Sequence, residues 1–119
     1  MPGFELILSI STFEHIGFDD DASVSSGEKI LAAVRHCQGL LTESGRLVLT
    51  VPLGYNPDLD RLIVSGTLGV ARQSFLVRRG FSRWEECDLQ TALAHPYRHR
   101  FPYANSLGIL EFGKDAKPR

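Results

Sequence analysis

Apolar and polar positions divide the chain into short blocks that predict alternating strands and helices. The first block, Phe4–Ile10, is an apolar run that starts after Gly3, and such a run is typical of a parallel strand buried on both faces. The polar segment Ser11–His15 follows at once. Because open α/β sheets bind ligands at the carboxyl ends of their strands, we expect this segment to lie at a binding site.

The next blocks predict one helix and a second strand. Ser25 and Glu28 have the spacing of a capping box, and apolar residues recur at helical spacing behind them. Arg46–Val51 is rich in Val and Leu and is closed by a proline, as expected of a second buried strand. A helix between two strands forms a right-handed crossover, so we expect Phe4–Ile10 and Arg46–Val51 to be parallel neighbours.

The second half of the chain predicts helix, strand, short helix and strand. Asn56 followed by proline is a strong helix start. Gln73–Arg79 has the composition of a strand, and Phe81–Cys87, with a Ser–Glu capping pair near its start, predicts a short helix. His95–Tyr103 contains two prolines and predicts a loop, and Asn105–Gly113 predicts the last strand.

Composition narrows the class of protein. A chain of 119 residues with 43% hydrophobic content suits one domain, residues 1–119, and the net charge of −1 does not favour nucleic acid or an anionic membrane as partner. The apolar runs are too short to span a membrane, and the first residues lead into a strand without a basic segment, so we expect no secretory signal. Two cysteines, Cys37 and Cys87, both in predicted helices, indicate a reducing, cytoplasmic setting.

Two segments carry a family resemblance. Phe-Glu-Leu-Ile-Leu-Ser-Ile-Ser-Thr-Phe-Glu-His-Ile, residues 4–16, and Gly-Arg-Leu-Val-Leu-Thr-Val-Pro-Leu-Gly, residues 45–54, resemble the fourth and fifth strands of class I S-adenosylmethionine-dependent methyltransferases. The resemblance implies that residues 1–119 are the C-terminal portion of such a domain. It also implies an α/β fold: a partial Rossmann-like three-layer sandwich whose four-stranded sheet is mostly parallel, with a last strand inserted antiparallel beside the fifth strand of the family.

The same resemblance implies a site. It suggests S-adenosylmethionine as cofactor, a small-molecule acceptor, and His15 with Glu14 near the reacting centre, since imidazole is a common general base near neutral pH. The residues implied to touch the sulfonium end of the donor are Ser9, Ser11 and Thr12. Tyr55, in the loop after the second strand, is placed on the substrate side by its position alone.

One departure from the family pattern bears on activity. No Gly-rich turn follows any strand, so most of the family's cofactor cradle has no counterpart in the 119 residues. The strand Phe4–Ile10 would also lack its usual neighbour and form an apolar edge. We therefore expect self-association, pairing with a separately encoded N-terminal half, or poor stability.

The sequence leaves three function classes open. The first is a methyltransferase portion acting on a small molecule. The second is an inactive, truncated methyltransferase-like domain that serves at most as an interaction module, in which Glu14 merely caps a turn and His15 has a backbone partner. The third is an unrelated doubly-wound α/β nucleotide-binding protein, because a fold alone does not assign chemistry.

Other polar clusters carry weaker signals. Asp19–Asp21 lacks the alternate spacing of calcium loops and predicts a solvated acidic loop. His95 and His99 have the spacing of a helical metal pair, but Pro96 opposes a helix there, so we assign no metal. Arg98–Phe101 alternates basic and aromatic residues, which favours a surface loop with cation–π packing over a phosphate or RNA contact.

Overall fold

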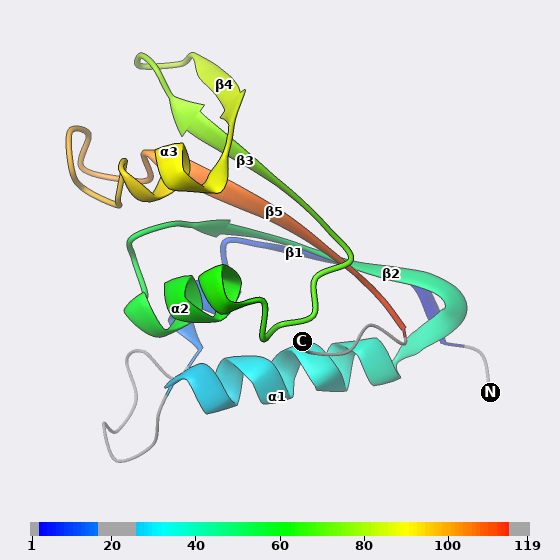
Figure 1. Ribbon diagram of the computed structural model, residues 1–119. Helices are drawn as coiled ribbons and strands as arrows, with labels where there is room; N and C mark the ends of the chain where they lie inside the picture. Colours follow the sequence, from blue (N-terminus) through cyan, green and yellow to red (C-terminus); the bar gives the residue numbers. More distant parts are fainter. Residues whose placement is uncertain (1–2, 17–25, 115–119) are drawn as a thin grey trace.

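The computed structural model describes residues 3–16 and 26–114. Figure 1 shows its elements along the chain. They are β1 (Phe4–Ile10), the short 3-10 helix η1 (Phe13–His15), α1 (Ser26–Gly39), β2 (Leu41–Pro52), α2 (Pro57–Ser65), β3 (Arg72–Arg78), β4 (Trp84–Cys87), α3 (Leu89–Leu93) and β5 (Ser106–Gly113).

The strands form one five-stranded mixed sheet in the order β1-β2-β5-β3-β4. Among residues 3–16 and 26–114, only β1 and β2 pair in parallel; the pairs β2–β5, β5–β3 and β3–β4 are antiparallel. The expectation of a four-stranded, mostly parallel sheet in a partial Rossmann-like three-layer sandwich is therefore wrong. The last strand, β5, does pair antiparallel with β2 as the resemblance implied, but by lying between β2 and β3 it replaces a parallel contact with two antiparallel ones. The unpredicted strand β4 then adds a further antiparallel pair at the edge of the sheet.

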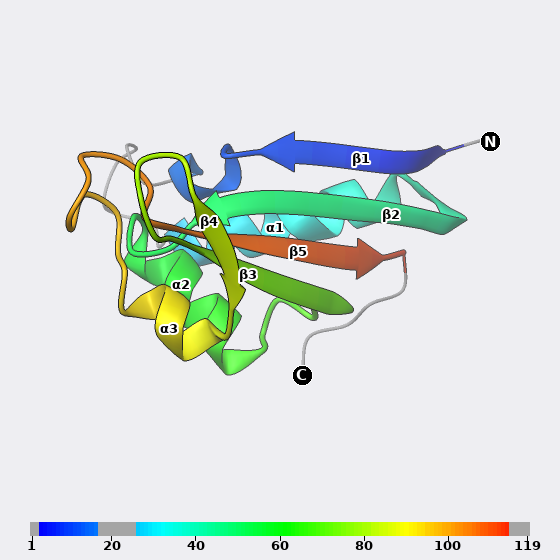
Figure 2. The same ribbon diagram turned by 90° about the horizontal axis from the view of Figure 1, so that it is seen from above.

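The described helices form a single layer on one face of the sheet. Figure 1 shows α1 and α2 beneath the strands, and in Figure 2, which looks from above, no helix covers β1, β2 or β5. α3 joins the same layer because Ala92 belongs to the same core. The strands contribute Leu47, Leu49, Val51, Phe75, Leu110 and Phe112 to this core, and the helices contribute Ile30, Val34, Leu59, Ile63 and Ala92.

β1 is an edge strand with one uncovered face, so the expectation that both its faces are buried is wrong. Ile7 and Ser9 point to the helix layer and are half-buried. The alternate row carries large apolar side chains that are more than half exposed: Phe4 58%, Leu6 60%, Leu8 56% and Ile10 65%. Strand and parallel partner were both predicted, but apolar content alone does not show which faces other elements cover.

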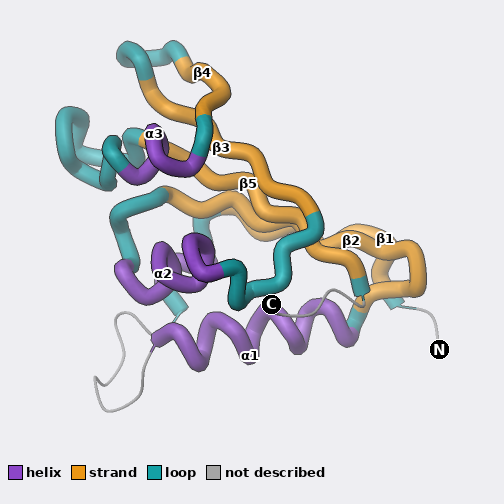
Figure 3. The backbone as a smooth tube through the Cα atoms, viewed as in Figure 1, coloured by secondary structure: helices purple, strands orange, loops and turns teal. Residues whose placement is uncertain are grey.

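The segment predicted as a short helix is partly a strand. β4 pairs with β3 from Phe75–Cys87 to Arg78–Trp84, and a turn closed by the Arg79 N–H and the Arg83 carbonyl joins the two strands. Cys87 therefore lies on a strand, and α3, a single short helix, follows instead (Figure 3). Cross-strand pairing with β3 overrides a local capping signal, because such signals are weak beside tertiary contacts.

α2 confirms the sequence prediction closely. The Asn56 side chain accepts hydrogen bonds from the Asp58 and Leu59 N–H groups, and Pro57 is the first helical residue. Gly66 ends the helix with a φ of 76°. Ser25 and Asp19–Asp21 lie outside the described residues.

Candidate functional site

The polar residues after β1 and β2 lie together, because the two strands are parallel neighbours and end at the same edge. The Ser11 N–H donates to the Thr50 carbonyl at 2.8 Å, which continues the β1–β2 pairing past the end of β1. Ser11 has a φ of 51°, in the left-handed region that non-glycine residues rarely adopt. This conformation reverses the chain into η1, which carries Glu14 and His15.

Glu14, His15 and Tyr55 form a series of three polar groups. Glu14 Oε2 lies 3.6 Å from His15 Nε2, and the Tyr55 hydroxyl lies 3.1 Å from His15 Nδ1. The His15 and Tyr55 rings also meet edge to face with centroids 4.9 Å apart. The imidazole therefore has a carboxylate at one nitrogen and a hydroxyl at the other, which is the order of groups in hydrolase triads.

Glu14 is the buried member of this series. Its side chain is 3% exposed, whereas that of His15 is 50% exposed. Burial raises the pKa of Glu14 above its ordinary value, opposed by its backbone hydrogen bond and by the charge of His15. Oε1 of Glu14 has no hydrogen-bond partner among the described residues. A buried carboxylate oxygen without a partner carries a desolvation cost, which agrees with the raised pKa of Glu14.

Asn56 positions the two halves of the series relative to each other. Its Nδ2 donates to the Glu14 carbonyl at 3.0 Å, while its Oδ1 caps α2. The Gly54 N–H donates to the Asp60 carboxylate at 3.0 Å, and burial raises the pKa of Asp60. Tyr55 thus projects from a short loop fixed at both sides.

A third loop reaches the site, and sequence reasoning did not connect it. The Tyr97 N–H donates to the Leu53 carbonyl at 3.0 Å, and the Tyr97 ring packs edge to face on Tyr55 at 5.0 Å. Gly54, with a φ of 77°, lies against Pro96, and a Cβ there would clash with Pro96. Loop contacts of this kind depend on tertiary folding, so the spacing of the residues carries no signal for them.

The residues implied to touch a methyl donor lie at the same edge. Ser9 lies on the helix side of β1, and Ser11 and Thr12 are exposed just beyond it. The Thr12 hydroxyl donates to the Ile10 carbonyl at 3.2 Å, so it satisfies a strand-end group. The sequence contains no Gly-rich turn after any strand that could add phosphate- or nucleoside-type contacts to these hydroxyls.

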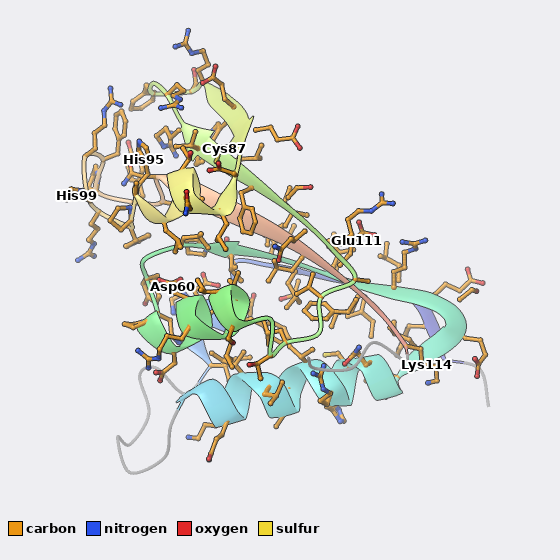
Figure 4. The ribbon with its side chains drawn as sticks, viewed as in Figure 1. Asp60, Cys87, His95, His99, Glu111 and Lys114 are labelled. Atoms are coloured by element: carbon orange, nitrogen blue, oxygen red, sulfur yellow. The ribbon has the colours of Figure 1, made fainter. Side chains whose placement is uncertain are left out.

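The two histidines considered as a metal pair, His95 and His99, belong to no metal-binding cluster among the described residues. Figure 4 shows His95 and His99 at the end of α3 and the loop behind it; His95 Nδ1 lies 2.8 Å from the Thr91 carbonyl, which requires a proton on Nδ1. Residues 3–16 and 26–114 contain no group of three or more His, Cys, Asp or Glu side chains suited to a metal ion.

Trp84 packs under the Arg78 guanidinium at 4.4 Å. Cys37 and Cys87 are free thiols.

Comparison with known proteins gives no assignment: no family model, curated protein or solved structure matches the chain. In the part of the chain that the structure describes, every helix is too short or too polar to cross a bilayer.

Proposed function

We propose that the chain is part of an S-adenosylmethionine-dependent methyltransferase that acts on an oxygen or nitrogen of a small molecule. The observation that carries the proposal is the series Glu14, His15 and Tyr55 at the shared carboxyl end of the parallel strands β1 and β2. The half-exposed imidazole is reachable from solvent, and the buried Glu14 lies behind it.

Each member of the series has a chemical role in this proposal. Bound S-adenosylmethionine would supply an electrophilic methyl group, so the protein has to align the acceptor and remove its proton. Tyr55 takes the acceptor proton while its own hydroxyl proton passes to Nδ1 of His15. Glu14 orients the imidazole and stabilises the imidazolium that forms, as the carboxylate of a triad does.

The donor-binding half of the site has to come from outside these 119 residues. Ser9, Ser11 and Thr12 offer contacts to the sulfonium end, and the nucleoside end needs a Gly-rich turn that the sequence lacks. A cytoplasmic location agrees with two free cysteines, because disulfides are rare in reducing compartments.

Calorimetric titration with S-adenosylmethionine and S-adenosylhomocysteine at millimolar concentration tests this function. We expect weak binding that His15→Ala reduces and His36→Ala, a change of an exposed histidine on α1, leaves unchanged. Absence of heat with both ligands would overturn the methyltransferase proposal and leave the chain as an interaction module.

A second candidate function, association through β1, is favoured by a separate observation. β1 pairs with β2 on one side only, and its outward row of Phe4, Leu6, Leu8 and Ile10 is more than half exposed. Unpaired strand edges with apolar side chains recruit further strands. In the complete enzyme we propose that a strand of the donor-binding half occupies this edge, as the family resemblance implies.

For the chain by itself we propose that the occupant is a second copy. Antiparallel pairing of two β1 strands about Ile7 would place Phe4 opposite Ile10, Leu6 opposite Leu8 and Glu5 opposite Ser9. No like charges meet in this register, and opposite apolar side chains stabilise strand pairs.

Light scattering after size exclusion over a range of concentrations tests the association. We expect a dimer that Leu8→Lys converts to monomer, since Leu8 is 56% exposed and contributes little to the core. The matched control is Val64→Lys on α2, where the side chain is 58% exposed, and it should leave the dimer intact. A wild-type monomer at all concentrations, or equal effects of the two variants, would overturn the proposal.

A further inference from the structure

The loop after α3 carries unpaired positive charge next to the candidate site. The sequence has no Asp or Glu from position 89 to position 110, whereas the loop contains Arg98 and Arg100 together with His95 and His99. Arg98 and Arg100 are exposed, and within the described ranges their guanidinium groups have no carboxylate partner and donate no hydrogen bond.

Arg78, in contrast to Arg98 and Arg100, is held by both hydrogen bonds and ring contacts. Its Nε donates to the Ala104 carbonyl at 3.0 Å, and its guanidinium packs on Trp84, Phe101 and Tyr103. Arg98 and Arg100 each contact a single ring, at 5.7 Å to Tyr97 and 5.4 Å to Phe101, and neither guanidinium donates a hydrogen bond to a described residue. Their hydrogen-bond donors therefore remain available to a ligand.

The loop holds its shape without the two arginine side chains. Asn105, 1% exposed, donates to the Pro96, Phe101 and Tyr103 carbonyls and accepts from the Phe101 N–H. Arg98 and Arg100 have φ values of 65° and 134°, which non-glycine residues adopt only where the surroundings impose them.

Contacts join this loop to the proposed reacting centre. The Arg98 guanidinium lies over Tyr97, the Tyr97 ring packs on Tyr55, and the Tyr55 hydroxyl contacts His15. We propose that Arg98 and Arg100 bind a phosphate or carboxylate group of the small-molecule acceptor, whose other end then lies at Tyr55. Guanidinium groups bind both anions through paired N–H donors, and such remote contacts align a substrate for reaction. The acceptor role rests on the proposed methyltransferase function; the anion site itself does not.

Amide chemical-shift mapping with inorganic phosphate, and separately with acetate, at low ionic strength tests the site. We expect saturable shifts at residues 97–101 and an affinity at least about tenfold weaker in the Arg98→Gln/Arg100→Gln variant, the scale of one lost charge-assisted contact. The matched control is Arg46→Gln/Arg61→Gln, which removes two arginines that have carboxylate partners elsewhere.

The pattern of shifts in these titrations separates an anion site from its alternatives. Shifts scattered over the surface, or equal loss in the two double variants, would overturn the anion site. Tighter binding of a short single-stranded oligonucleotide than of phosphate, with shifts at Phe101, would replace the acceptor by RNA and also overturn it. Phosphate binding without any S-adenosylhomocysteine binding would keep the anion site and remove the methyltransferase, so the two failures can be told apart.

Discussion

The Tyr55 hydroxyl lies 3.1 Å from Nδ1 of His15, although forty positions separate the two residues. The contact arises because β1 and β2 are parallel neighbours, so the segments that follow them meet at one edge of the sheet. It gives the imidazole a hydroxyl on the side opposite to Glu14.

Removing that hydroxyl should have a small, specific effect on stability. Tyr55→Phe keeps the ring contacts with His15 and Tyr97 but removes one hydrogen bond, so we expect a loss of about 1 kcal/mol in the free energy of unfolding by urea. Tyr97→Phe is the control, because the Tyr97 hydroxyl has no hydrogen-bond partner in the described part of the chain. Equal losses in both variants would show that the contact contributes nothing.

Glu14 should make stability depend on pH. Because burial raises its pKa in the folded state, the fold retains its proton more strongly than the unfolded chain does. Stability should therefore fall as pH rises from about 4.5, the ordinary value, through the raised folded pKa. Asp60 adds a change of the same sign from about 3.8.

Glu14→Gln removes the titrating carboxyl and with it part of the fall in stability as pH rises. The thermal midpoint of the variant minus that of wild type should therefore increase as pH rises from about 4.5. Glu43→Gln, at an exposed position, controls for the loss of one negative charge. A wild-type stability that rises over the range, with Glu14→Gln destabilised at neutral pH, would contradict the burial argument.

Gly54 should be the most sensitive glycine near the site. Gly54→Ala puts a Cβ into Pro96 at a φ of 77°, and we expect a loss of about 2 to 3 kcal/mol in unfolding free energy together with altered Tyr97 contacts. Gly66→Ala, at a φ of 76° with nothing within 4 Å, should cost only the backbone strain of about 1 kcal/mol. Similar costs for both would argue against close packing of the Pro96 loop.

Asn105 should hold the cationic loop in place. Asn105→Ala leaves several loop carbonyls without their donor, so we expect a loss of about 2 to 4 kcal/mol in unfolding free energy, measured by chemical denaturation. Fluorescence of Trp84, which lies on the neighbouring hairpin, reports whether the loss extends beyond the loop. A change below about 0.5 kcal/mol would contradict the role of Asn105.

Sequence patterns predicted the kind and order of the elements in the first half of the fold, but α1 ends at Gly39 and β2 begins at Leu41, five residues before the predicted strand Arg46–Val51. The β1 and β2 segments, α1 and the Asn56 cap of α2 depend on local periodicity and capping, which a sequence displays directly. The same patterns placed Glu14 and His15 after β1 and Tyr55 after β2. Their juxtaposition followed from the parallel pairing alone.

The second half could not be predicted in the same way. Trp84–Cys87 has a capping signal that pairing with β3 overrides, and α3 is a five-residue helix with little periodicity. The family resemblance implied a last strand antiparallel beside the second strand, and β5 does pair there with β2, but no local pattern in the sequence indicates this sheet order. The approach of Pro96 and Tyr97 to Tyr55 depends on that order, so the third loop of the site was missed.

Amide chemical-shift mapping with S-adenosylhomocysteine tests the central claim most directly, because it locates binding by residue. The account predicts millimolar binding with shifts concentrated at residues 9–15 and at Gly54 and Tyr55, reduced by His15→Ala. Shifts confined to other parts of the molecule, or none at millimolar ligand, would contradict a methyl-donor site at the end of β1.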